Sequence, residues 1–265
     1  MLRLKRKLLA GVVGIILTLS PFASSQTPES PGQVNSVNRQ LNMLVLGDSI
    51  LWGEGLKTQH KSWYQVKTWL EANTGRPVIE RIEAHSGAVI ERGSADDSLT
   101  ATNAEVNLAL PTVNEEVDNA LRFYADRSTV DVVLISACGN DVGVQNLLNA
   151  SGSEEIHRMT QAKCGPPMEK LLRKVATSFP AAQLIVVGYY PFFSEKTRND
   201  FIMKALARRF FKSVPGTPRL GRKEVLEQLT ANSSTWYETS NRTLAEVARK
   251  INAELGDGRQ RIMFA

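Results

Sequence analysis

The sequence predicts a single α/β domain, a flavodoxin-like three-layer α/β/α sandwich around a parallel five-stranded sheet of order 2-1-3-4-5. Two observations favour this fold class. Several short runs are apolar at every position, which is typical of parallel strands that are covered on both faces. The segments between these runs carry apolar residues at helical spacing, so strands and helices alternate along the chain.

The elements can be justified in chain order. Met43–Leu46 is a continuous apolar run that Gly47 ends, and Pro77–Ile82 is a second, weaker run. Between them, Ser62–Ala72 spaces its aromatic and aliphatic residues as a helix does. The same two patterns continue, helix and strand in turn, at Val113–Tyr124, Val130–Ala137, Met168–Phe179, Leu184–Gly188, Leu244–Leu255 and Arg261–Phe264.

The first 25 residues are typical of an export signal. Four cations between residues 3 and 7 precede the apolar run Leu8–Leu19, and the small residues Ala23–Ser25 follow. The apolar run is shorter than the roughly 20 residues that span a bilayer. We therefore expect cleavage near Ser25 and a secreted or periplasmic protein, with an uncleaved N-terminal membrane anchor as the alternative.

Composition limits the partners. Without the four cations of the signal, the formal charge of the chain falls from +5 to +1. A protein this close to neutral has no overall field that would attract nucleic acid, so no nucleic-acid partner is expected. Residues 26–40 are polar and contain two prolines, which suits a flexible leader. The domain is expected to cover residues 41–265 and to be a monomer.

One part of this domain does not follow the alternating pattern. Pro215–Pro218 and Asn232–Ser234 resemble linkers and mark an irregular insertion around residues 194–235. Inside it, Lys204, Arg208 and Lys212 are spaced as one face of a basic amphipathic helix. Such a helix could form a lid or make weak contact with an anionic membrane surface, but more often a stripe of this kind is the solvated side of a covering helix.

The chain has two cysteines, Cys138 and Cys164. In an oxidising compartment we expect them to form a disulfide, and two buried thiols are the alternative. Neither cysteine is paired with a histidine in a way that would indicate a nucleophile. The cysteines and the scattered histidines also lack the spacing of a metal site. The sequence therefore predicts neither a metal nor another cofactor.

A serine follows the first strand directly. The strand ends at Gly47, and Asp48 and Ser49 lead into the next segment. A serine that enters a helix at a strand end lies beside free main-chain N–H groups and the positive end of the helix dipole, where an anion is stabilised. Ser49 could therefore be a nucleophile whose attack creates an oxyanion, although a helix-capping serine has the same pattern.

Two other strand ends favour the nucleophile. The second strand leads into Gly87, and the third leads into Asn140 and Asp141. In a sheet of order 2-1-3-4-5 the second and third strands flank the first, so their carboxyl ends meet beside Ser49. Glycine lets a main-chain N–H approach a substrate closely, and asparagine offers side-chain donors. Together with the Ser49 N–H, these groups would form an oxyanion hole.

At these residues the sequence resembles the SGNH (GDSL) hydrolases, a family of serine esterases and lipases. The resemblance covers about residues 42–265 and is carried by three blocks, Gly47-Asp48-Ser49-Ile50, His85-Ser86-Gly87 and Gly139-Asn140-Asp141. It implies that Ser49 is the nucleophile of an esterase that forms an acyl-enzyme. It also implies that the Ser49 N–H, the Gly87 N–H and the Asn140 side chain stabilise the oxyanion, with Asp48 and Asp141 in support.

One block of the family pattern is missing. The family takes its general base from an Asp-x-x-His motif after the fifth strand, and none of His60, His85 and His157 lies in such a motif. Three explanations stay open: a truncated or frameshifted copy of a longer hydrolase, which we favour; recruitment of His85 or His157 as the base; or a catalytically impaired relative that only binds esters, lipids or glycans.

The substrate class is less clear from the sequence. Trp52 and the aromatic residues Tyr189, Tyr190, Phe192 and Phe193 could rim a site for an acyl chain or a sugar. Packing at the edge of the sheet would explain them equally well. We expect a small-molecule, lipid or glycan ester.

Overall fold

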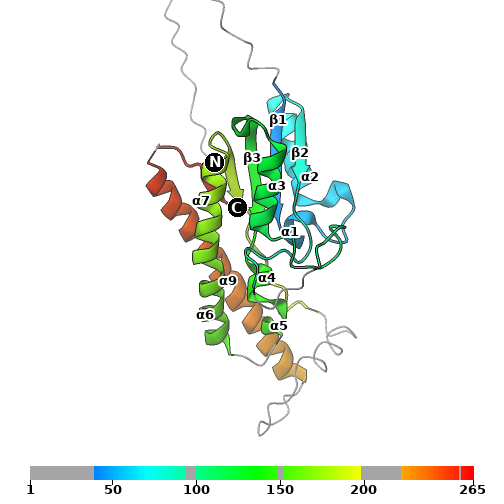
Figure 1. Ribbon diagram of the computed structural model, residues 1–265. Coiled ribbons are helices and arrows are strands. Elements are labelled where there is room, and N and C mark those ends of the chain that lie inside the picture. Colours follow the sequence, from blue (N-terminus) through cyan, green and yellow to red (C-terminus); the bar gives the residue numbers. More distant parts are fainter. Residues whose placement is uncertain (1–38, 94–98, 149–151, 198–221, 257) are drawn as a thin grey trace, which may run out of the picture. The chain divides into compact units, whose positions relative to one another are not determined.

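The computed structural model describes residues 39–93, 99–148, 152–197, 222–256 and 258–265. Its strands form one parallel five-stranded sheet of order β2-β1-β3-β4-β5 (Figure 1). The predicted fold class and strand order are therefore confirmed. The strands are β1 (Leu41–Gly47), β2 (Val78–Ile82), β3 (Val130–Ser136), β4 (Gln183–Val186) and β5 (Ile262–Phe264).

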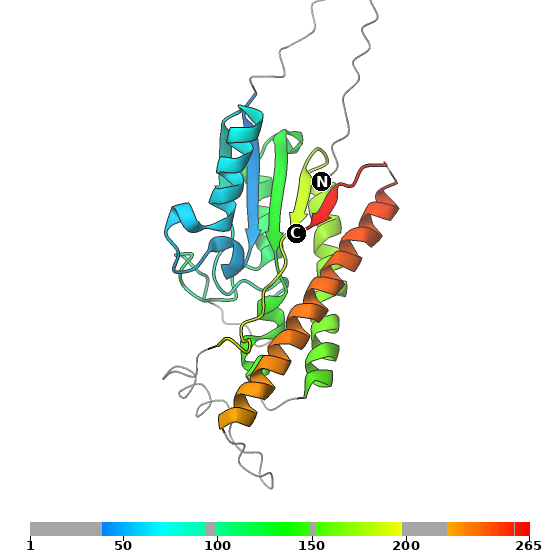
Figure 2. The same cartoon turned by 180° about the vertical axis from the view of Figure 1, so that it is seen from behind.

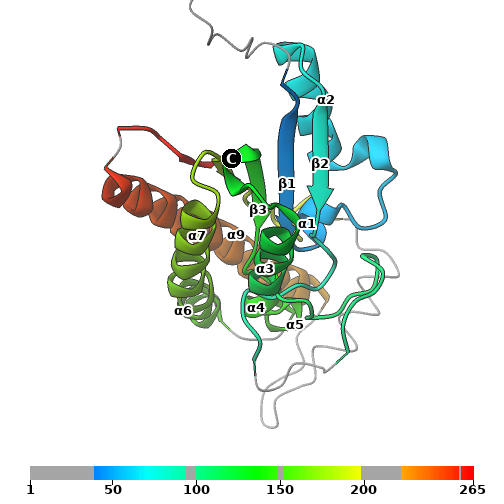
Figure 3. The same ribbon diagram turned by 45° about the horizontal axis from the view of Figure 1, so that its top comes forward.

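The helices between the strands fall into two groups. The longer helices are α2 (Ser62–Thr74), α3 (Val113–Phe123), α6 (Ser153–Cys164), α7 (Pro166–Ser178) and α9 (Arg222–Leu255). The short ones are α1 (Ser49–Trp52), α4 (Gly139–Val142) and α5 (Val144–Leu147), with 3₁₀ turns η2 (Thr58–His60) and η3 (Arg127–Thr129). The short helices α1 and α4 lie at the same end of the sheet, where β1 and β3 end (Figures 1 and 3).

Both faces of the sheet are covered, as continuous apolar runs predict. Helices α3 and α7 lie over one face, and α2 lies over the other (Figures 1 and 2). On β1, Leu44 and Leu46 pack toward α3 and α7, whereas Met43 and Val45 pack toward Trp63 of α2. Because neighbouring strand residues point to opposite faces, each of the four positions Met43–Leu46 needs an apolar residue.

Helix α9 includes Asn232–Ser234, which the sequence predicted to be a linker. Asn232 and Ser233 lie inside this helix and are fully buried. The Asn232 side chain donates a hydrogen bond to the Leu147 carbonyl (3.2 Å), and the Ser233 hydroxyl accepts one from the Phe193 N–H (3.0 Å). Residue types that are common in loops are here satisfied by tertiary partners.

Helix α9 packs alongside α6 and α7 (Figure 2). The basic segment with Lys204, Arg208 and Lys212 lies outside the described residues, as do the signal and nearly all of the leader. None of the described helices is both long and apolar enough to cross a membrane.

Candidate active site

The turn after β1 presents Ser49 at the start of a helix. Asp48 caps α1, because its carboxylate accepts a hydrogen bond from the Ile50 N–H (3.0 Å). Ser49 is the first helical residue, so its own N–H has no acceptor within the helix. Neither its hydroxyl nor its N–H is hydrogen-bonded to any residue that the structure describes. No described residue therefore competes with a ligand for either group.

The chain after β2 brings Gly87 to the neighbouring position. Beyond the strand the chain continues along β1, where the His85 N–H donates to the Gly47 carbonyl (2.9 Å). Gly87 then turns with a φ of +91°, and a Cβ there would lie 2.4 Å from Asn107 Oδ1. Only glycine fits this turn. Although Gly87 is buried, its N–H makes no hydrogen bond within the described ranges, and a buried N–H normally has a partner.

The turn after β3 carries Asn140 in α4. The Asn140 Nδ2 atom donates a hydrogen bond to the carbonyl of Ala88, the residue next to Gly87 (2.9 Å). A side-chain amide nitrogen has two hydrogens, so this bond orients the side chain and leaves one hydrogen for a ligand.

Asp141 ties the same two turns together through a second contact. Both of its carboxylate oxygens accept from the Ile90 N–H (3.1 Å each). Burial raises the pKa of Asp141 to about 6, although the bond to Ile90 acts in the opposite direction.

The turns after β1 and β3 are also joined. The Asp48 N–H donates to the Ser136 carbonyl (3.1 Å), and the Ser136 hydroxyl donates to Asp48 Oδ1 (3.0 Å). The other oxygen, Oδ2, accepts a hydrogen bond from the Tyr189 hydroxyl (2.7 Å). Asp48 is buried, and this burial raises its pKa, while the three donors lower it. The predicted residues Ser49, Gly87 and Asn140 thus lie on three turns that are directly bonded to one another.

Tyr189 has a role that the sequence did not indicate. Its ring is buried and packs against Trp236, and its hydroxyl lies between Asp48 and the Gly139 N–H. For Tyr189, the structure therefore favours packing over a place at the rim of a substrate site. Tyr190 and Phe192 are 59% and 37% exposed.

The contacts of His85 argue against its use as the general base. Its Nδ1 lies 2.9 Å from the Ser86 carbonyl and its Nε2 lies 2.7 Å from the Pro111 carbonyl. Both ring nitrogens therefore face main-chain oxygens, and neither faces Ser49.

The other two histidines do not bond Ser49 either. His157 is half-buried, and its Nδ1 lies 2.9 Å from Thr239 Oγ1 of α9. His60 is exposed in η2.

The sequence patterns did not indicate a buried acid, Glu116, next to the Ser49 turn. Glu116 of α3 accepts a hydrogen bond from the Gly47 N–H (2.6 Å), and its other oxygen has no hydrogen-bond partner in the described part of the chain. Burial raises its pKa well above the usual range. The available signal was its position on the apolar face of the helix, between Val113 and Ala120.

Cys138 and Cys164 are joined by a disulfide that links the start of α4 to the end of α6. No group of three or more metal-ligating side chains occurs in the portion of the chain that is described.

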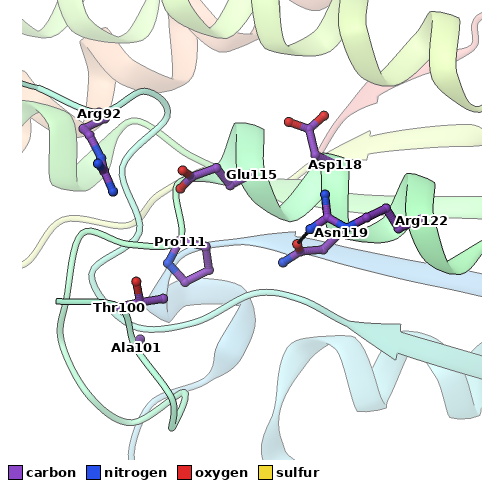
Figure 4. A pocket seen from close by; sticks show the side chains of 8 residues that line it. All are labelled: Arg92, Thr100, Ala101, Pro111, Glu115, Asp118, Asn119 and Arg122. Atoms are coloured by element: carbon purple, nitrogen blue, oxygen red, sulfur yellow. Dashed lines mark hydrogen bonds between the residues drawn. The ribbon is translucent and has the colours of Figure 1, made fainter. Parts of the chain in front are cut away.

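A polar pocket of about 500 Å³ lies elsewhere, beside α3 (Figure 4). None of Ser49, Gly87 and Asn140 lines it. The residues that do are Arg92, Thr100, Ala101, Pro111, Glu115, Asp118, Asn119 and Arg122.

Comparison with known proteins identifies the family. Residues 45–258 match the GDSL-like Lipase/Acylhydrolase family. Similar solved structures include an extracellular lipase from Streptomyces rimosus (17% identity, 84% of this chain and 79% of that chain, TM-score 0.46). They also include a phospholipase A1 from Streptomyces albidoflavus (15%, 85% and 79%, TM-score 0.48) and an aryl esterase from M. smegmatis (15%, 85% and 83%, TM-score 0.42).

A search of curated proteins found no match. The structural likenesses are distant, and the assignment rests on the family match, which spans most of the chain. The chain belongs to the GDSL-like lipase/acylhydrolase family and is a hydrolase of ester bonds.

Proposed function

We propose that this hydrolase is an exported serine esterase that cleaves carboxylic esters through an acyl-enzyme on Ser49. The observation that carries the proposal is the Ser49 hydroxyl at the start of α1, which bonds no described residue and whose turn is joined to the turns of Gly87 and Asn140. The N–H groups of Ser49 and Gly87, which have no acceptor among the described residues, and the second hydrogen of Asn140 Nδ2 would converge on one oxygen atom.

The proposed reaction has two steps. Ser49 Oγ adds to the ester carbonyl carbon, the carbonyl oxygen becomes an oxyanion, and the three donors stabilise its charge. Collapse of this intermediate expels the alcohol, which carries away a proton, and leaves an ester between the acyl group and Ser49. Water then adds to that ester, the bond from the acyl carbon to Ser49 Oγ breaks, one proton of the water returns to Oγ, and the acid is released. One oxyanion donor typically contributes about 100- to 1,000-fold in rate.

Asp48 and Asp141 would act in support, without touching the substrate. Asp48 caps the helix that Ser49 begins, and Asp141 holds the turn of Asn140 to Ile90. Both contacts fix main-chain positions from which the oxyanion donors extend.

Transfer of the Ser49 proton limits the expected rate. A serine hydroxyl is a weak nucleophile without a base, and none of the three histidines is hydrogen-bonded to it. General-base assistance is typically worth about 100- to 10,000-fold. We therefore expect slow turnover by this chain, with the oxyanion donors supplying most of the acceleration.

Export is supported by the cationic, apolar and small-residue segments of the first 25 residues. The disulfide between Cys138 and Cys164 suits the same compartment, because disulfides persist in oxidising environments. The substrate would be a small-molecule, lipid or glycan ester.

A fluorophosphonate probe tests the proposal. The full-length protein should be labelled at Ser49, and Ser49→Ala should abolish labelling. Ser62→Ala is a matched control, because Ser62 is also the first residue of a helix but lies exposed on α2. A folded protein that resists labelling would contradict the acyl-enzyme. It would favour the second candidate, a protein that binds esters without cleaving them, which the engaged nitrogens of His85 also favour.

A further inference from the structure

The hydroxyl of Tyr189 joins two turns of the candidate site that are 91 residues apart in the sequence. It donates a hydrogen bond to Asp48 Oδ2 (2.7 Å), on the turn that carries Ser49. It also accepts one from the Gly139 N–H (2.8 Å), on the turn that carries Asn140. Each bonded residue is the immediate neighbour of a proposed site residue, so a shift of the hydroxyl would move both turns.

The polarity of the two bonds is fixed by chemistry. A main-chain N–H can only donate, so the Tyr189 oxygen must accept from Gly139 and use its single hydrogen for Asp48. The bond to Asp48 then has the strength of one made to a carboxylate. Burial and the neighbouring Asp48 charge raise the pKa of Tyr189 well above its usual value, which keeps this hydrogen in place at neutral pH.

The ring of Tyr189 is itself held by α9. Asn241 brackets its main chain, because Oδ1 accepts from the Tyr189 N–H (2.9 Å) and Nδ2 donates to the Tyr189 carbonyl (3.0 Å). The ring packs against Trp236 at a centroid distance of 4.9 Å. The hydroxyl is therefore presented from a fixed frame.

The turn at Cys138 and Gly139 packs closely against the end of the Tyr189 side chain. A Cβ on Gly139 would lie 3.0–3.2 Å from the outer ring atoms and the hydroxyl oxygen of Tyr189, so a side chain there would press the ring away. Cys138, directly before, has a φ of +96°, a conformation that is unfavourable for a residue other than glycine. Such a backbone persists only where its surroundings hold it, and the bond from Gly139 to Tyr189 is one of the contacts that do so.

We propose that Tyr189 is a positioning residue that keeps the Ser49 turn and the Asn140 turn in catalytic register. It touches no substrate; it acts through Asp48 and Gly139. The inference rests on the proposed function for its effect on rate, but the bonds it describes can be tested independently of activity.

The first test is Tyr189→Phe, which keeps the ring and removes both hydrogen bonds. A displacement of about 1 Å in a site can cost about 100-fold in rate. We expect kcat for p-nitrophenyl acetate to fall by roughly 10- to 100-fold and the rate constant for fluorophosphonate labelling to fall by a similar factor. KM should stay within twofold of the wild-type value. Tyr64→Phe is the matched control, because its hydroxyl on α2 has no hydrogen-bond partner among the described residues and its loss should change nothing.

The second test uses no activity. Hydrogen exchange of the main-chain N–H groups of Gly139 and Ile50 should be faster in Tyr189→Phe than in the wild type, while exchange in α2 should be unchanged. This result is expected even if Ser49 is never labelled, so failure of the proposed function and failure of this inference are distinguishable.

A second variant covers the case in which Tyr189→Phe does not fold. Gly139→Ala retains the hydroxyl but pushes the ring away, and it should lower the labelling rate as Tyr189→Phe does. Gly152→Ala is its control, because no atom lies within 4 Å of a Cβ there. Two results would overturn the inference. One is unchanged hydrogen exchange at the Gly139 N–H in Tyr189→Phe. The other is a labelling rate and a kcat within twofold of wild type in a folded Tyr189→Phe or Gly139→Ala protein.

Discussion

Replacement of Asp141 by asparagine should remove a pH dependence from the free energy of unfolding. In the folded protein, burial raises the pKa of this carboxyl from 3.8 to about 6. The Ile90 N–H and the charge of Lys163 lower the pKa, and the charge of Asp48 raises it further. Asparagine has the same shape and still offers an oxygen to the Ile90 N–H, but it does not titrate.

The sign follows from proton binding. Between pH 4 and pH 6 the folded chain holds more protons at Asp141 than the unfolded chain does, because its folded pKa is the higher one. Stability of the wild type therefore falls as the pH rises through this window. With pKa values of 3.8 and about 6, linkage gives a loss of about 2 kcal/mol between pH 4.5 and pH 7.5. Solvent screening makes this an upper limit, since the residue is partly exposed.

Urea unfolding of the wild type and Asp141→Asn at pH 4.5 and pH 7.5 measures the effect. Asp48 and Glu116 also have raised pKa values, but both proteins contain them, so their contributions cancel apart from the interaction of the Asp48 charge with Asp141. The variant should gain stability relative to the wild type by about 1–2 kcal/mol on going to the higher pH. A difference between the two proteins that stays constant with pH would refute the raised pKa and the burial that causes it.

Three further predictions concern the site and its support. Asn140→Ala should lower kcat about 100- to 1,000-fold with little change in KM, measured by steady-state kinetics; a loss under threefold would remove Asn140 from the proposed oxyanion hole. Gly87→Ala should lower the melting temperature more than Gly75→Ala. Both glycines have a positive φ, but only at position 87 would a Cβ lie as close as 2.4 Å to another atom. Equal shifts in melting temperature would contradict the close packing. Reduction of the Cys138–Cys164 disulfide, which closes a separation of 26 residues, should lower the free energy of unfolding by about 3.5 kcal/mol, and an unchanged denaturation midpoint would speak against that contribution.

The sheet could be predicted from the sequence because burial on both faces leaves a local trace. A strand that is covered on both faces needs apolar residues at successive positions, as Met43 to Leu46 show, and such runs are visible without any knowledge of their partners. The strand order then placed Ser49, Gly87 and Asn140 on neighbouring turns, although they are far apart along the chain.

Helix α9 could not be predicted in full because its first half depends on tertiary contacts. Asn232 and Ser233 have weak helix propensity, and they are stabilised in the helix by Leu147 and Phe193, which are distant in the sequence. For the same reason the sequence left open whether Tyr189 rims a substrate site or packs. Its partners Asp48 and Gly139 lie on the turns after β1 and β3, and nothing in the sequence around Tyr189 indicates these contacts.

The central claim is that donors on three turns surround one oxygen atom bound to Ser49. A crystal structure of the covalent fluorophosphonate adduct tests it most directly. The account predicts a phosphoryl oxygen about 2.7–3.1 Å from the Ser49 N, the Gly87 N and Asn140 Nδ2 together. An adduct on Ser49 whose phosphoryl oxygen faces solvent, away from Gly87 and Asn140, would contradict it.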